Sequence, residues 1–179
     1  MRKYAIFILC VFFVSCAAVS SNAKYHRQAV ALAKHRNYDA AFLKLRALLN
    51  DNPQSAYAPD AAFAVAEYYF QSGDYLDATV AFRRYINAYS GHDGIVFAEL
   101  MIYKMATEKG PNKNIPFNER YFLDSIRKRM FQKPVFIIFK EKKESLSYTS
   151  DFGNNYTAFD HIDKISITRN GELFFELTP

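Results

Sequence analysis

Few side chains in this sequence stand at the spacings that catalysis or metal binding requires. No two histidines lie four residues apart, which is the spacing of a helical zinc site. Ser90, His92 and Asp93 have the residue types of a nucleophilic triad, but a triad is assembled in space from separate segments. We therefore predict a protein that is not an enzyme and that holds no metal or cofactor. The histidines, each expected to be a single surface residue, are His26, His35, His92 and His161.

One polar cluster near the C-terminus leaves an alternative open. Its members are Asp151, Asp160, His161 and Asp163. A ligand-binding or enzymatic module built on them would need a cleft in which these side chains converge. A flat, exposed sheet without such a cleft would remove this alternative.

The first residues of the chain have the composition of an export signal. Arg2 and Lys3 precede an apolar run over Tyr4–Val14, and small residues follow it. This order is typical of a secretory signal, and the run is shorter than the roughly 20 apolar residues that span a bilayer. Both cysteines of the chain, Cys10 and Cys16, lie in this segment, so no disulfide supports the remainder.

The sequence Phe13-Val14-Ser15-Cys16 resembles the lipobox of bacterial lipoproteins, although that motif prefers leucine at the position of Phe13. The resemblance implies cleavage before Cys16 and lipid attachment to its sulfur and amine. Ala17 follows where aspartate would be an inner-membrane signal, which favours the outer membrane. The alternative is cleavage after Ala23, which would discard both cysteines and release a soluble periplasmic protein.

The sequence repeats itself at an offset of 37 residues. A small residue, a larger apolar residue, a tyrosine after a polar break and a small–large helical stripe occur twice in the same order. Self-similarity at this period predicts an array of helical hairpins. The paired positions are Ala29 and Ala66, Leu32 and Tyr69, Tyr38 and Tyr75, Ala41 and Ala78, Leu45 and Phe82, and Leu48 and Tyr85.

Polar and proline-containing breaks divide this array into helices. Asn37 and Pro53 end helical patterns, Gly73 suits a left-handed turn, and Asp74 can cap the next helix. A third, diverged unit follows and ends before Pro134. The predicted helices cover residues 24–36, 38–49, 59–71, 75–89, 95–109 and 119–131.

After Pro134 the pattern changes to that of a small sheet. Val135–Phe139 and Ser145–Thr149 are predicted strands, and residues 151–155 are a predicted loop. Asn170-Gly171 lies between alternating runs over 164–169 and 172–177, which is a strong hairpin signal. A sheet of three or four strands is marginal alone, so we expect it to pack on the last helices.

The repeat pattern resembles the tetratricopeptide repeat, and the connector 55–60 resembles that of the outer-membrane assembly lipoprotein family (BamD-like, also called YfiO or ComL). The resemblance covers residues 24–106. It implies a lipid-anchored adaptor whose partners are a BamA-like assembly protein or unfolded outer-membrane protein segments. Family members carry about five repeats and this chain stops near three, so contacts of the later repeats do not carry over. The residues that carry the pattern are Ala66, Tyr69, Gly73, Tyr75, Ala78 and Phe82, with Ala29, Leu32, Tyr38, Ala41, Leu45 and Pro53 in the other copy.

One stripe of the predicted helix 59–71 is a candidate partner-binding groove. In tetratricopeptide repeats the corresponding stripe lines a concave peptide groove, where Phe63 and Phe70 would be apolar anchors and Glu67 would accept from a donor. Burial of Phe70 against the preceding hairpin is the alternative. The full stripe is Asp60, Phe63, Glu67, Phe70 and Gln71.

A basic patch is the second candidate surface. Residues 104–143 hold eleven basic and four acidic side chains, while residues 144–179 hold two basic and six acidic ones. Arg127, Lys128, Arg129 and Lys133 could meet lipid head groups or acidic residues of a partner. Nucleic acid is not expected, because the protein is exported.

Taken together, the sequence predicts a mainly α fold, α+β overall, in which a helical-hairpin repeat array carries a small C-terminal antiparallel sheet. The predicted divisions are a signal over 1–23, repeats over 24–131 and a β module over 132–179. The predicted function is that of an envelope scaffold anchored at the periplasmic face of the outer membrane. The alternative is a soluble periplasmic repeat protein of the Tol–Pal or cell-division type.

Overall fold

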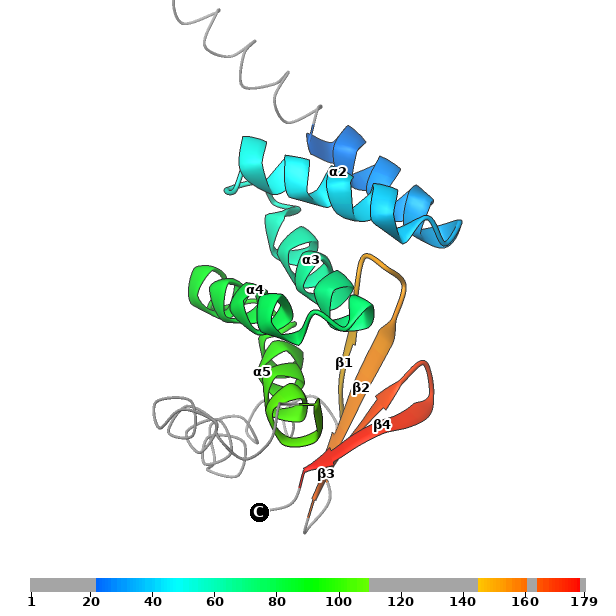
Figure 1. The fold of residues 1–179 in the computed structure, drawn as a ribbon, viewed down its shortest axis with the longest axis vertical. Coiled ribbons are helices and arrows are strands. Elements are labelled where there is room, and N and C mark those ends of the chain that lie inside the picture. The colour runs from blue at the N-terminus through cyan, green and yellow to red at the C-terminus, as the bar shows by residue number, and fades with distance from the viewer. Residues whose placement is uncertain (1–21, 110–144, 161–163, 178–179) are drawn as a thin grey trace, which may run out of the picture.

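The computed structural model describes residues 22–109, 145–160 and 164–177. Helices occupy the first of these ranges and a four-stranded sheet occupies the other two, so the predicted mainly α, α+β class is confirmed. The sheet lies against one side of the helical array (Figure 1). The helices are one over residues 22–34, α2 (Tyr38–Asp51), α3 (Ala58–Ser72), α4 (Tyr75–Ala88) and α5 (Ile95–Lys104).

The first two helical hairpins turn where the sequence breaks predicted. Asn37 caps α2, because its side chain accepts a hydrogen bond from the Ala40 amide at 3.3 Å. Gly73 adopts φ of 83° after α3, a left-handed conformation that glycine reaches without steric cost. Asp74 stands at the capping position of α4 but makes no capping hydrogen bond with its side chain.

Small residues let these helices pack closely. The repeated alanines Ala29, Ala41, Ala66 and Ala78 are buried, and so are the larger repeated residues Leu45, Leu48, Phe82 and Tyr85. Tyr38 and Tyr75 are half-buried at the start of their helices. The 37-residue pattern is therefore the pattern of helix–helix contact.

The third unit differs from the expected single helix over 95–109. α5 ends at Lys104 and continues as a π-helical turn, η1 (Met105–Lys109). α5 is buried on nearly all sides, because it packs against α4 and against the sheet. The predicted helix over 119–131 and the predicted strand Val135–Phe139 lie outside the described residues.

The sheet has antiparallel strands in chain order: β1 (Ser145–Thr149), β2 (Asn155–Asp160), β3 (Ile165–Arg169) and β4 (Glu172–Leu177). The predicted strand 145–149 and the hairpin at Asn170-Gly171 are confirmed, and both turn residues have positive φ. The predicted loop over residues 151–155 is confirmed except at Asn155, where β2 starts; β2 pairs with β1 and was not predicted as a strand. In β2, buried Tyr156 and Ala158 alternate with more exposed residues.

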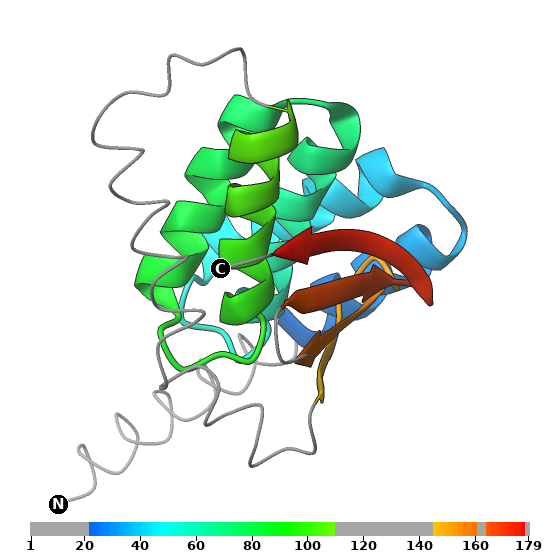
Figure 2. The same ribbon diagram turned by 90° about the horizontal axis from the view of Figure 1, so that it is seen from below.

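The sheet and the helices share one apolar core. The largest cluster of buried residues joins α3, α4 and α5 to all four strands. A second cluster joins the first hairpin to the β1–β2 loop through Phe152. Figure 2 shows the strands stacked beside α5 with the earlier helices behind them. The expected packing on the last helices is thus only part of the contact, because α3 and the first hairpin also receive the sheet.

Gly94 marks the tightest point of this shared core. A Cβ atom there would lie 2.5 Å from Tyr85 Oη, 3.2 Å from Tyr148 Cζ and 3.3 Å from Phe63 Cδ2. Because these rings are buried, they can yield only by shifting α4, α3 or the sheet.

We predict that Gly94→Ala lowers the free energy of unfolding by about 1–3 kcal/mol, the usual cost of overpacking a core. Gly91→Ala is the matched control, since its Cβ would meet no atom within 4 Å. Urea denaturation of the purified proteins measures both. Equal stabilities of the two variants would contradict this account of the core.

Candidate functional site

The stripe predicted to bind a partner faces the protein's own sheet. We call the side of α3 formed by Asp60, Phe63, Glu67 and Phe70 the inner face. Phe63 and Glu67 are 0% exposed and Phe70 is 9% exposed. Gln71, the fifth predicted residue, is exposed beyond the end of this contact.

Aromatic rings of the sheet cover the two phenylalanines of the inner face. The ring of Phe63 lies 4.7 Å from that of Tyr148 and 6.2 Å from that of Tyr156, with edge-to-face geometry. Phe70 meets Phe174 in the same way at 6.1 Å. Both phenylalanines are thus apolar anchors, as predicted, but the segment that they hold belongs to this chain.

Glu67 supplies the polar centre of the inner face. Its Oε1 accepts hydrogen bonds from Asn154 Nδ2 at 2.8 Å and from Tyr156 Oη at 2.5 Å. Burial raises the pKa of the Glu67 carboxyl above its ordinary value; Ser150, Tyr156, the charge of Arg169, and Asn154 act in the opposite direction. A buried carboxyl must find such donors, because leaving it unpaired would be costly.

Arg169 is a cation whose charge acts on the Glu67 carboxyl. Its guanidinium lies 5.9 Å from the ring centre of Tyr156 and 5.7 Å from that of Phe174. It is therefore held over aromatic faces of the sheet, while its charge favours the ionised form of Glu67.

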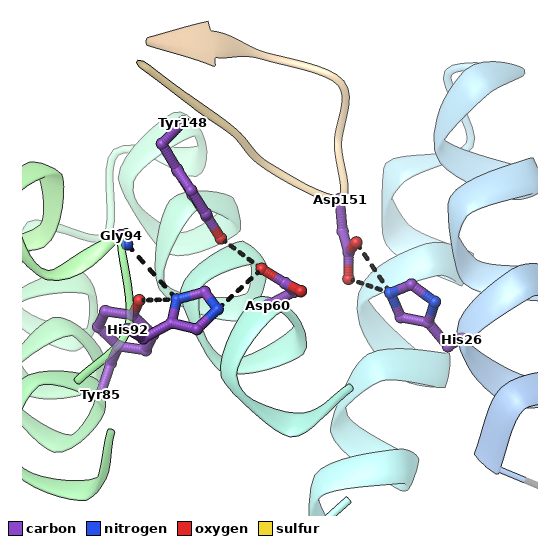
Figure 3. Close-up of polar contacts among 7 residues, drawn as sticks. All are labelled: His26, Asp60, Tyr85, His92, Gly94, Tyr148 and Asp151. Carbon is purple, nitrogen blue, oxygen red and sulfur yellow. Dashed lines mark hydrogen bonds and ion pairs between the residues drawn. The ribbon is translucent and has the colours of Figure 1, made fainter. Parts of the chain in front are cut away.

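Asp60 begins a second polar chain at the N-terminal end of α3 (Figure 3). Tyr148 Oη donates to Asp60 Oδ1 at 2.9 Å, and His92 Nε2 lies 3.5 Å from the same oxygen. The other ring nitrogen of His92 lies 2.7 Å from Tyr85 Oη and 3.4 Å from the Gly94 amide. Because a backbone amide can only donate, Nδ1 of His92 accepts from Gly94, while Nε2 faces Asp60.

His26 forms the third polar link between helices and sheet. Its Nε2 lies 2.9 Å from both carboxylate oxygens of Asp151, which is 125 residues further along the chain (Figure 3). The hydrogen bond to Asp151 raises the pKa of His26; burial opposes this, and the charges of Asp151 and Asp60 add to it. The ring of His26 also stacks on Tyr57 with centroids 4.6 Å apart.

The predicted partner-binding stripe at Asp60, Phe63, Glu67 and Phe70 therefore contacts this chain's own sheet. Strands β1, β2 and β4 supply rings and donors that cover the inner face, although Glu67 Oε2 is buried without a hydrogen-bond partner among the described residues. Phe70 is buried, as the alternative expected, but it lies in the cluster of α3, α4, α5 and the sheet and not in that of the preceding hairpin. A partner-binding role of the stripe stays a prediction.

The remaining predicted sites fall largely outside the described residues. Cys16 and the basic patch lie there, as do His161 and Asp163 of the C-terminal polar cluster. Asp151 of that cluster is engaged with His26. In the part of the chain that the structure describes, no group of three or more His, Cys, Asp or Glu side chains is placed to hold a metal ion.

Sequence reasoning missed two histidines. His26 and His92 were expected to be single surface residues, yet both are partly buried and pair with carboxylates. The contact between His92 and Tyr85 had a weak signal in the sequence, because His92 lies only seven residues after Tyr85 at the end of the same hairpin. His26 had none, since its partner lies in a distant strand connection.

The sequence also matches a known protein family. Residues 18–133 match the family YfiO, described as an outer membrane lipoprotein, and this span is more than half of the 179 residues. The chain belongs to the YfiO family. The YfiO match begins two residues after Cys16 and includes every helix of the described array. Comparisons with curated proteins and with solved structures found no significant match.

Membership of the YfiO family confirms the resemblance that the repeats indicated, and it indicates a location in the cell envelope. Of the helices within residues 22–109, none has both the length and the apolar character needed to cross a bilayer. The β module from residue 145 onward lies beyond the YfiO match.

The raised pKa of Glu67 predicts a pH-dependent stability. Its folded pKa lies above the unfolded value of 4.5, so its contribution is fully present below pH 4.5 and is lost as the pH rises through the folded pKa. Glu67→Gln keeps an acceptor and cannot ionise. We expect the stability of the wild type relative to this variant to fall between pH 4.5 and 8 in denaturant titrations.

Glu172→Gln, which removes an exposed carboxyl of β4, is the control and should show no such trend. A constant difference between the wild type and Glu67→Gln over this pH range would exclude a raised pKa at Glu67.

The His26–Asp151 pair gives a separate prediction. The pKa of His26 is raised above 6.5 in the folded state. The pair therefore stabilises fully below pH 6.5, and that contribution disappears as the pH rises through the folded pKa. His26→Gln should lose most stability relative to wild type at pH 5.5 and less at pH 8.5. His35→Gln, at an exposed position, is the control; a loss independent of pH would show that the pair is not charged.

Proposed function

We propose that this chain is a lipid-anchored adaptor at the periplasmic face of the outer membrane, where it binds other envelope proteins during the assembly of β-barrel proteins. The observation that carries the proposal is the YfiO match, which covers the helical array and begins beside Cys16. In this role lipid on Cys16 tethers the protein, and the helices and sheet present binding surfaces. A BamA-like assembly protein or an unfolded outer-membrane protein segment is the partner class.

The described geometry supports binding more than catalysis. Polar groups of the inner face contact the sheet and its β1–β2 loop: Asp60 with Tyr148, and Glu67 Oε1 with Tyr156 and Asn154. His26 of the first helix likewise pairs with Asp151. Side chains held in this way position a sheet and do not approach a substrate. The adaptor therefore offers its outer surfaces to partners while the sheet stays on the inner face.

We predict that Cys16→Ala removes a diacyl or triacyl mass increment and releases the protein from the outer-membrane fraction. The physical reason is that a lipid-modified cysteine would anchor the protein through its acyl chains. Intact mass spectrometry and membrane fractionation of the protein made in a bacterium measure both effects.

Cys10→Ala is the matched control, because Cys10 lies in the same apolar run but not at its end. It should keep both the lipid mass and the membrane location. An unmodified wild-type protein that begins at Lys24 and fractionates as soluble would overturn the anchor and favour the periplasmic Tol–Pal-type alternative.

A further inference from the structure

A groove runs between α2 and α4 on the side of α3 that faces away from the sheet. We call it the outer groove. Ala62, Val65 and Tyr69 of α3 form its floor, and at helical spacing these residues lie on nearly the opposite side from Phe63 and Glu67. Its volume is about 400 Å³, within the range of protein ligand sites. The sheet does not contribute to its lining.

The walls of the outer groove carry two arginines. Tyr89 Oη donates to the Pro53 carbonyl at 3.3 Å, which ties the C-terminal ends of α2 and α4 together. Arg46 precedes Pro53 by seven residues and Arg84 precedes Tyr89 by five, so the two arginines lie at similar heights on facing walls. Neither forms an ion pair with another described residue; Arg46 lies over the Phe42 ring at 5.5 Å. Asp77, seven residues before Arg84, is the acidic residue of the lining.

Exposed apolar side chains accompany these charges. Val80 lines the groove and is 40% exposed, and Leu76, one turn earlier on α4, is 80% exposed. Leu43 on α2 is 64% exposed, one turn before Arg46. These are three of the five large exposed hydrophobic residues in the described part of the chain. Their concentration on the two groove-forming helices indicates a surface that gains by being covered.

We propose that the outer groove binds an acidic peptide segment of another envelope protein, with an apolar side chain on Tyr69 and Val80 and carboxylates on Arg46 and Arg84. Arginine suits this task, because its planar guanidinium pairs with a carboxylate through two parallel hydrogen bonds. The arginines outnumber Asp77, so charge complementarity selects an acidic occupant. The basic stretch 104–143 of this chain has the wrong charge for the site.

This inference rests on the proposed adaptor function and names its contact surface. Peptides that bind the purified full-length protein are selected from a random 12-residue library. Their dissociation constants are measured by fluorescence anisotropy. The peptides should combine Asp or Glu with an apolar residue and bind less tightly as salt rises. Arg46→Glu with Arg84→Glu should weaken binding at least tenfold and should instead bind peptides whose acidic residues are replaced by lysine.

The double variant Arg27→Glu with Lys34→Glu is the matched control, because it makes the same charge change at exposed positions of the helix over residues 22–34. It should bind as the wild type does. Denaturation curves of both double variants show whether each is folded. If Arg46→Glu with Arg84→Glu does not fold, Arg46→Gln with Arg84→Gln replaces it in the binding measurement.

Several results would overturn the proposal: no selected peptide, selected peptides without acidic residues, or binding that both double variants preserve. Arginine-dependent association of the protein with itself in sedimentation experiments, or arginine-dependent binding to vesicles of anionic phospholipid in place of peptide, would assign the groove to a second copy or to a membrane. These experiments do not depend on lipid at Cys16, so they can fail while the anchor prediction succeeds, and the reverse holds as well.

Discussion

The ring of Phe63 is the point on which the two halves of this structure depend. It packs against Phe82 and Tyr85 of α4 on one side and against Tyr148 and Tyr156 of the sheet on the other. Aromatic pairs of this kind add to the stabilisation that burial already provides. Because one side chain belongs to both interfaces, the packing of the repeats and the docking of the sheet cannot be separated energetically.

Around that ring, the sheet covers the stripe of α3 that the sequence predicts as a peptide groove. The inner face offers apolar anchors and one carboxyl, and the sheet answers with aromatic rings, Asn154 and the hydroxyl of Tyr156. Among the described residues, it is the sheet that covers this face of α3. The sheet therefore buries the apolar anchors that this face of α3 would otherwise expose.

Periodicity predicted the helices well because the small and large residues of each repeat are set by helix contact. It also placed Phe63, Glu67 and Phe70 on one face, but spacing shows which residues share a face and not what covers it. β2 was missed since Asn154 and Asn155 are typical turn residues and the buried Ala158 is a weak strand former. The bond between His26 and Asp151 joins residues 125 positions apart, a separation at which a single sequence carries no pairing signal.

The contact between the first helix and the β1–β2 loop also sets an order of folding events during synthesis. Local hairpins can form as soon as they emerge, whereas contacts of long sequence separation must wait for the rest of the chain. Until residues 145–177 follow, Phe63 and Phe70 lack the sheet residues that bury them, and exposed apolar faces of this kind promote aggregation. A chain that stalls before its last strands would thus expose Phe63 and Phe70, and completion of the sheet would bury them.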